Sequence, residues 1–171
     1  MELKYYPDRV LRKKTRPIQE VNDDVMERAR QMLEVMYEAE GVGLAGPQVG
    51  WGRRIVTIDV EGAKPQDRVF VNPLIVRRDG MTEQEEGCLS LPGIKVKIPR
   101  AEKVTVVAYT LAGERVEFDF EGLAACVWQH ELDHLNGVLI IDKLPPTTLI
   151  TIREQLKQLE EQVKKAQDQE A

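Results

Sequence analysis

The sequence lacks the features that mark membrane, secreted and nucleic-acid-binding proteins. No apolar run approaches the ~18–20 residues that span a bilayer, and the N-terminal stretch MELKYYPDRVLRKKTRP has no apolar signal-peptide core. Lysine and arginine form no dense cluster, and the formal net charge is -5. Because such a chain attracts polyanions poorly, no direct nucleic-acid partner is expected. Because it has neither a membrane-spanning run nor a signal-peptide core, we expect a cytoplasmic protein with no membrane partner.

Cysteine and histidine are scarce, with two of each. A disulfide between Cys88 and Cys126 is not expected in a reducing cytosol, so each thiol is either a packing group or a reactive or metal-binding group. Cys126 lies inside a predicted helix between Ala125 and Val127, where a small buried hydrophobe is the expected role.

The 171 residues, of which 42% are hydrophobic, predict a single domain spanning residues 1–171. Apolar periodicity predicts helices from Asn22 or Asp23 to about Glu40, from after Phe120 to Gly137, and over residues 147–170. Strands are predicted at residues 54–60, 68–72, 74–77, 103–110 and 115–120, with Pro73 separating the second and third. The predicted class is α+β: antiparallel or mixed β-sheets packed around a central helix, with an N-terminal and a C-terminal helix.

The stretch GVGLAGPQVG, Gly41–Gly50, contains the pattern G-x-G-x-x-G. A dinucleotide fingerprint follows a strand and opens a helix whose N–H groups face the pyrophosphate. Here a predicted helix precedes the glycines and Pro47 follows them directly, which argues against a nucleotide site. The glycines instead indicate close passage of the backbone along a substrate, with Gln48 directed into the site.

Both histidines lie in the hexapeptide QHELDH, Gln129–His134, on the predicted central helix. Histidines four residues apart share one helix face, so His130 and His134 can hold one metal ion, with Glu131 able to reach its water without ligating it. The alternative is that both are surface residues of a charged helix. Leu123 and Val127 precede them on the same helical line, which predicts that the histidines continue a buried stripe.

A third ligand is needed, and Cys88 is the leading candidate, expected in a loop between strand-like segments beside Gly87. The ordinary alternative is a small buried hydrophobe. Metallopeptidases with this helix motif often use a downstream acid instead, and Glu154 and Asp142 are available. Glu154 falls among regular charge pairs of the last predicted helix, where a solvated role is ordinary.

Three stretches together resemble the signature motifs of the peptide deformylases. In chain order they are GVGLAGPQ at residues 41–48, EGCLS at residues 86–90 and QHELDH at residues 129–134. The resemblance covers nearly the whole chain. One position departs from it, because the first motif usually has two alanines before the proline and here the second is Gly46.

The resemblance implies a hydrolase that removes the formyl group from N-formyl-methionyl peptides, that is, from nascent chains, and releases formate. Cys88, His130 and His134 would ligate the metal and leave one tetrahedral position for water. Glu131 would accept the proton of that water and later pass it to the departing amine. The Gln48 amide, the Leu89 backbone N–H and the metal would stabilise the oxyanion.

The implied substrate site is an apolar pocket for the methionine side chain beside an extended peptide. The matching pocket positions are Val42, Leu123, Val127 and the His130 ring, and peptide backbone would pair with Val42, Gly43 and Gly87. The family commonly uses Fe²⁺, while Cys/His₂ ligation also accepts Zn²⁺, Ni²⁺ or Co²⁺. The last predicted helix mixes both charge signs, so ribosome docking, proposed for some relatives, has weak support here.

Three further side chains near these motifs have expected supporting roles. Glu86 and Arg100 are expected to form an ion pair behind the Cys88 loop, and Asp133 is expected to point outward into solvent. Gln129 either orients a ligand or packs the helix. The competing functions are a peptidase that cuts internal amides, and a non-catalytic metal-containing peptide-binding module. Glu131 and Gln48 argue against the module, because binding alone needs no general base.

Overall fold

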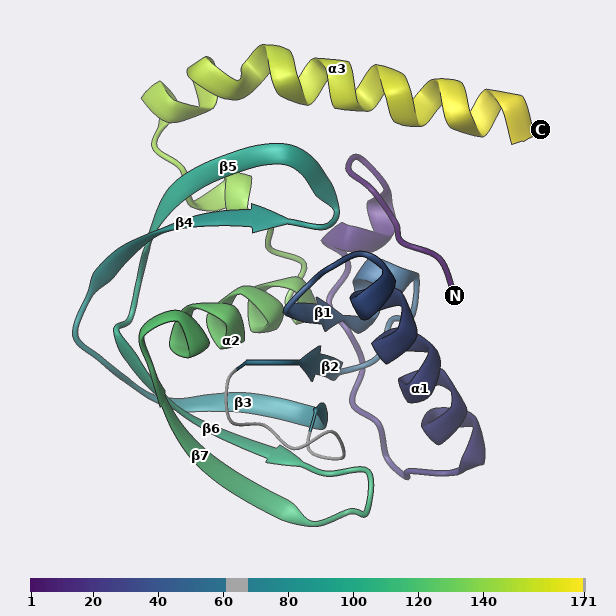
Figure 1. Cartoon of the computed structure of the whole chain (residues 1–171), viewed down its shortest axis with the longest axis vertical. Helices are drawn as coiled ribbons and strands as arrows, with labels where there is room; N and C mark the ends of the chain where they lie inside the picture. The colour runs from purple at the N-terminus through teal and green to yellow at the C-terminus, as the bar shows by residue number, and fades with distance from the viewer. Residues whose placement is uncertain (61–67, 171) are drawn as a thin grey trace.

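The computed structural model describes residues 1–60 and 68–170, which form two β-sheets on either side of a buried helix (Figure 1). That central helix is α2, Gly122–Leu135. The N-terminal helix α1, Asp23–Glu38, packs at one end of the larger sheet, and the C-terminal helix α3, Pro146–Glu170, lies across the smaller one (Figure 1). Short 3-10 helices cover Arg9–Arg12, Gly46–Val49 and Ile140–Lys143. The predicted α+β class is confirmed.

The larger sheet has the strand order β1-β2-β3-β6-β7, and every neighbouring pair is antiparallel. Its strands are β1 Gly43–Ala45, β2 Ile55–Ile58, β3 Val69–Asp79, β6 Lys103–Tyr109 and β7 Arg115–Glu121. The smaller sheet is the hairpin of β4, Thr82–Cys88, and β5, Leu91–Arg100. The glycine-rich stretch therefore supplies an edge strand to one sheet, and Cys88 ends a strand of the other.

Two expectations about the strands are wrong. Pro73 does not divide two strands, because β3 runs through it and absorbs the missing N–H where the pairing with β6 shifts register between Val71 and Leu74. Cys88 does not lie in a loop, because it is the last residue of strand β4. The hairpin β4–β5 to which it belongs was not predicted. Its first strand reads TEQEEGC, and glutamate and glutamine have low strand propensity, so the pattern gave no strand signal.

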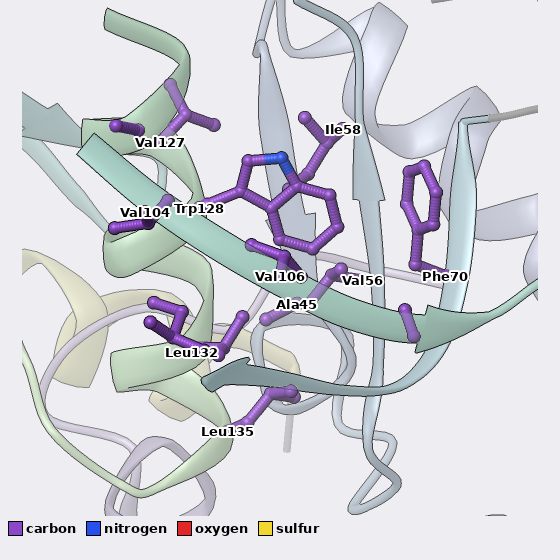
Figure 2. Close-up of a cluster of buried hydrophobic side chains, with 13 residues drawn as sticks. Ala45, Val56, Ile58, Phe70, Val104, Val106, Val127, Trp128, Leu132 and Leu135 are labelled. Carbon is purple, nitrogen blue, oxygen red and sulfur yellow. The ribbon is translucent and has the colours of Figure 1, made fainter. Parts of the chain in front are cut away.

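A cluster centred on Trp128 holds α2 against the larger sheet (Figure 2). The Trp128 ring is fully buried and meets Phe70 of β3 edge-on, with ring centroids 4.9 Å apart. Val56 and Ile58 of β2 and Val106 of β6 pack into the same cluster (Figure 2). Because this face of α2 is fixed in the core, the following histidines point to the smaller sheet.

A second cluster joins the smaller sheet to the C-terminal part of the chain. Leu91 of β5 and its alternate residues Ile94, Val96 and Ile98 are buried in one cluster with Ile152 and Leu159 of α3. The α1 helix begins where the Asn22 side chain accepts a hydrogen bond from the Val25 N–H. No helix among residues 1–60 and 68–170 has the length and apolarity needed to cross a bilayer.

Candidate metal centre and catalytic site

Three donor atoms from two separate elements meet at one point beside α2. The His134 Nε2 atom lies 3.3 Å from the Cys88 Sγ atom and 3.1 Å from the His130 Nε2 atom. All three lie within 4.8 Å of one another. Ligand atoms around one tetrahedral ion are ~3.3–3.6 Å apart when the metal–nitrogen and metal–sulfur bonds are about 2.0–2.1 and 2.3 Å. The arrangement therefore fits a single cation.

The surroundings of both imidazoles leave their Nε2 atoms available as ligands. The His130 Nδ1 atom lies 3.0 Å from the Glu86 carboxylate, which can only accept, so Nδ1 donates a proton to it and Nε2 is the ring nitrogen that faces His134. Burial, together with the nearby His130, lowers the pKa of His134 well below its ordinary value. A neutral imidazole is the form that binds a metal.

An ion-pair network stands behind these ligands. Arg100 is 4% exposed and donates two hydrogen bonds to Glu86, of 2.7 and 2.8 Å, which confirms the expected ion pair. Its third bond, of 2.6 Å, goes to Asp133, which also pairs with Lys143 at 3.2 Å. The expectation that Asp133 points freely into solvent is wrong, because Arg100 and Lys143 hold it against the fold. The network fixes the carboxylate that orients His130.

Replacing Arg100 by leucine is expected to destabilise the fold by about 3–5 kcal/mol, because a buried carboxylate is left without its partner. Burial raises the pKa of Glu86, but hydrogen bonds from Arg100 and His130 outweigh this and lower it to about 2. This stabilisation is complete above the unfolded pKa of 4.5 and is lost as the pH falls toward 2.

The test is urea unfolding of both proteins between pH 7 and pH 2. The wild type should lose stability below pH 4.5 more steeply than Arg100→Leu. Arg115→Leu, which removes an exposed ion pair with Glu117, is the matched control and should change little. Equal stabilities of Arg100→Leu and the wild type would show that the network does not hold the site together.

Glu131 lies next to the donors and is 3% exposed. Burial raises its pKa to about 7, and its Oε2 atom has no hydrogen-bond partner among the described residues. A carboxylate with a pKa near neutrality is suited to accept and return a proton. Gly43 of β1 makes room for it, since a Cβ at that position would lie 2.5 Å from the Glu131 Oε1 atom.

The Gln48 side chain is 1% exposed, and hydrogen bonds at both the oxygen and the nitrogen of its amide fix its orientation. Its Oε1 atom accepts a 2.8 Å bond from the Ala45 N–H, and its Nε2 atom donates to the Ser90 Oγ atom at 3.3 Å. The Nε2 atom also lies 3.7 Å from the Cys88 Sγ atom, so the amide donor faces the metal centre. Sequence reasoning included Ser90 in the motif EGCLS but gave it no role, because a single serine carries no distinctive spacing.

Gly46 is required by the backbone around it. A Cβ at this position would lie 2.6 Å from the Trp51 carbonyl oxygen and 2.7 Å from that of Arg53. Both are main-chain atoms that cannot rotate away. The alanine usual in related motifs therefore does not fit this chain, and Gly46 is a packing requirement of the turn that carries Gln48.

Gly46→Ala is consequently expected to destabilise the protein by about 1–3 kcal/mol, the range for overpacking a well-filled site. Gly52→Ala is the matched control, because a Cβ there meets nothing within 4 Å. Thermal unfolding of the two variants measures the difference. A Gly46→Ala protein as stable as the wild type would contradict the packing explanation.

A cavity of about 490 Å³ opens beside the donors between α2 and the hairpin β4–β5. Its walls include all five predicted substrate-contact residues: Val42, Gly43, Gly87, Leu123 and Val127. Leu89 and Cys126 line it as well, and Cys126 is 2% exposed, as a buried hydrophobe would be. Leu123 is 66% exposed, so the prediction that it belongs to the buried stripe is wrong. It lies in the first turn of α2, at the cavity rim rather than in the core.

The alternative acid ligands lie elsewhere. Glu154 is exposed on α3, while Asp142 pairs with Arg12 and accepts the Leu139 N–H. Neither belongs to the group of potential metal donors found among the described residues. Gln129 binds the backbone N–H and carbonyl of Ala101, which confirms the packing role over the ligand-orienting one.

The fold and the site are those of a class of hydrolase in which a thiol at a strand end, rather than an acid, lies with the two histidines of an H-E-x-x-H helix. The chain belongs to the polypeptide deformylase family, whose model matches residues 1–149. It is an enzyme of the class that hydrolyses the N-formyl amide.

The similarity to individual relatives extends over nearly the full length of the chain. Peptide deformylase from Chromobacterium violaceum is 42% identical over 162 residues, which cover 95% of this chain and 97% of the relative. The crystal structure of a peptide deformylase from Legionella pneumophila has a TM-score of 0.87 at 42% identity, covering 94% of this chain and 95% of that one. The crystal structure of peptide deformylase from Thermus thermophilus has a TM-score of 0.86 at 38% identity, covering 94% of this chain and 97% of that one.

Proposed function

We propose that this enzyme removes the formyl group from N-terminal formylmethionine of nascent peptides, with Cys88, His130 and His134 holding one divalent metal ion. The observation that carries the proposal is the meeting of these three donors beside one cavity, whose wall includes the buried Glu131 and the oriented Gln48. A divalent cation bound there supplies a Lewis acid for the formyl oxygen and a water of lowered pKa.

The chain's own residues carry the proton and the developing charge. Glu131 accepts a proton from the attacking water and delivers it to the departing amine. The Gln48 Nε2–H and the Leu89 backbone N–H donate hydrogen bonds to the oxyanion that forms from the formyl oxygen. Because Ala45 and Ser90 already hold the Gln48 amide, it needs little reorientation during the reaction.

The peptide binds along the exposed main chain of the cavity. Val42, Gly43 and Gly87 lie at the edges of β1 and β4, where an extended peptide adds as a further strand. Leu123, Val127 and the His130 ring form the apolar wall for the methionine side chain. The exposure of Val42 and Leu123 supports this role, since a bound methionine would cover apolar surface that the fold leaves open.

The metal we propose for the cell is Fe²⁺, with Zn²⁺, Ni²⁺ or Co²⁺ able to replace it in purified protein, because the donors accept all four. Elemental analysis after anaerobic purification identifies the ion. Nascent chains are the proposed partners, at a cytoplasmic site of action. The exposed face of α3 carries both charge signs and gives little support to docking on the ribosome.

Formate release from formyl-Met-Ala-Ser tests the function directly. We expect stoichiometric formate and free Met-Ala-Ser, with the internal amides intact. Cleavage of an internal amide without formate would favour a metallopeptidase. Metal binding with saturable peptide affinity but no product would favour a non-catalytic binding module.

Gln48→Ala is expected to lower kcat by about 10²–10³-fold, the usual cost of one oxyanion donor, which corresponds to about 2.7–4 kcal/mol. The metal content should stay the same. Gln129→Ala is the matched control, because this second buried glutamine binds only the backbone of Ala101 and Ala125. The folded Gln129→Ala protein should keep the wild-type kcat. An unchanged kcat in Gln48→Ala would remove Gln48 from the mechanism.

A further inference from the structure

A second, smaller cavity of about 250 Å³ lies behind the C-terminal half of α2. Gln129, Leu132, Asp133 and Asn136 line it, and at 3.6 residues per turn they lie on a different face of the helix from His130 and His134. Strand β3 supplies the facing wall through Leu74 and Ile75. The two cavities share no lining residue, so a ligand in one leaves the other open.

The walls of this rear cavity carry an excess of positive charge. Arg54, Arg78, Arg100 and Lys143 line it, against the single carboxylate of Asp133. Arg100 and Lys143 both use that same carboxylate. For a chain with a formal net charge of -5, such a local concentration of cations is unusual.

Arg54 is a partly buried cation that the fold leaves without a charged partner. Its guanidinium donates to the Asn136 Oδ1 atom at 3.1 Å and to the Pro73 carbonyl at 3.3 Å, and both acceptors are uncharged. Burial lowers its pKa. Among the described residues no carboxylate lies within ion-pair distance of Arg54 or of the exposed Arg78. A partly buried charge without a counter-ion is costly, and an anionic ligand would remove that cost.

We propose that the rear cavity binds a small oxyanion of the phosphate class, held by Arg54 and Arg78 with Lys143 at the rim. Planar guanidinium groups suit tetrahedral oxyanions because two N–H groups can reach two oxygens at once. The volume suits an anion of a few heavy atoms. A nucleic-acid strand is disfavoured by the overall negative charge.

Arg100 lines the rear cavity and also holds Glu86 against His130, so this residue lies between the rear cavity and the candidate metal donors. An anion near Arg100 shares this cation with Asp133 and leaves the two bonds to Glu86 in place. Phosphate is therefore expected to stabilise the fold without competing with the peptide substrate. The proposal concerns a site separate from deformylation and stands whether or not that activity is found.

Calorimetric titration of the metal-loaded protein with inorganic phosphate at constant ionic strength tests this inference, with chloride as the reference anion. We expect one saturable site. Arg54→Gln and Arg78→Gln should each weaken phosphate binding by about tenfold or more, since each removes a charge-assisted contact. Arg53→Gln is the matched control, because it removes the same charge one residue away, outside the cavity. The exposed Arg78 allows a test even if Arg54→Gln fails to fold.

Several results would overturn the proposal. These are the absence of saturable phosphate binding, an equal loss in Arg53→Gln, and competition between phosphate and formyl-Met-Ala-Ser, which would assign the anion to the metal centre. Binding of a single-stranded RNA oligonucleotide that phosphate does not displace would assign the charged surface to nucleic acid instead.

Discussion

Glu131→Gln is expected to reduce formate release from formyl-Met-Ala-Ser by about 10²–10⁴-fold, the range for loss of a positioned general base. The amide keeps the shape of the carboxylate but cannot accept the proton of the attacking water. Glu131 is 3% exposed and lies in the cavity wall beside His130, so no other group takes its place by a small movement. The effect should fall on kcat, with KM little changed.

Metal content separates a catalytic role of Glu131 from a structural one. The Glu131→Gln protein should retain one ion per chain and unfold at nearly the wild-type temperature, because the three donor atoms are untouched. Glu154→Gln, on the exposed face of α3, should match the wild type in every respect. Normal deformylation by Glu131→Gln would show that the proposed mechanism is wrong.

Cys88→Ala is expected to lower the metal content from about one ion per chain to near none, and formate release by about 10³-fold or more. Two imidazoles from one helix turn remain, which is one ligand short of a three-ligand catalytic site. A bound cation contributes several kcal/mol to stabilising the transition state, and each 1.36 kcal/mol is about tenfold in rate. Elemental analysis of anaerobically purified protein and the formate assay measure the two losses.

Cys126→Ala is the matched control, since it removes the other thiol of the chain. This residue is buried in α2 and lies outside the group of potential metal donors. Its variant should keep both metal and activity. Loss of metal in Glu154→Ala rather than in Cys88→Ala would move the third ligand to α3 and favour the peptidase interpretation.

The sequence predicted the helices well because their signals are local. Asn22 caps α1 as expected, and the apolar stripe of α1 is buried against the sheet. The hairpin β4–β5 could not be predicted, since β4 consists largely of residues with low strand propensity and is stabilised by pairing with β5. The continuity of β3 through Pro73 also depends on a neighbour, namely the register shift against β6.

The residues proposed for the candidate site come from three short motifs, and the fold brings them together beside one cavity. The network behind it was only partly predictable. The Glu86–Arg100 pair was expected, whereas the bonds of Asp133 to Arg100 and Lys143 join elements that no sequence spacing relates. The reason for Gly46 was also hidden, because the carbonyls of Trp51 and Arg53 approach it only after the turn has folded.

X-ray absorption at the metal edge of the reconstituted protein tests the central claim most directly, because it reads the atoms bound to the ion. We expect one sulfur at about 2.3 Å and two imidazole nitrogens at about 2.0–2.1 Å, with a light atom completing the shell. The sulfur contribution should persist in Cys126→Ala. A shell of nitrogen and oxygen alone in the wild-type protein would contradict the assignment of Cys88 as the third ligand.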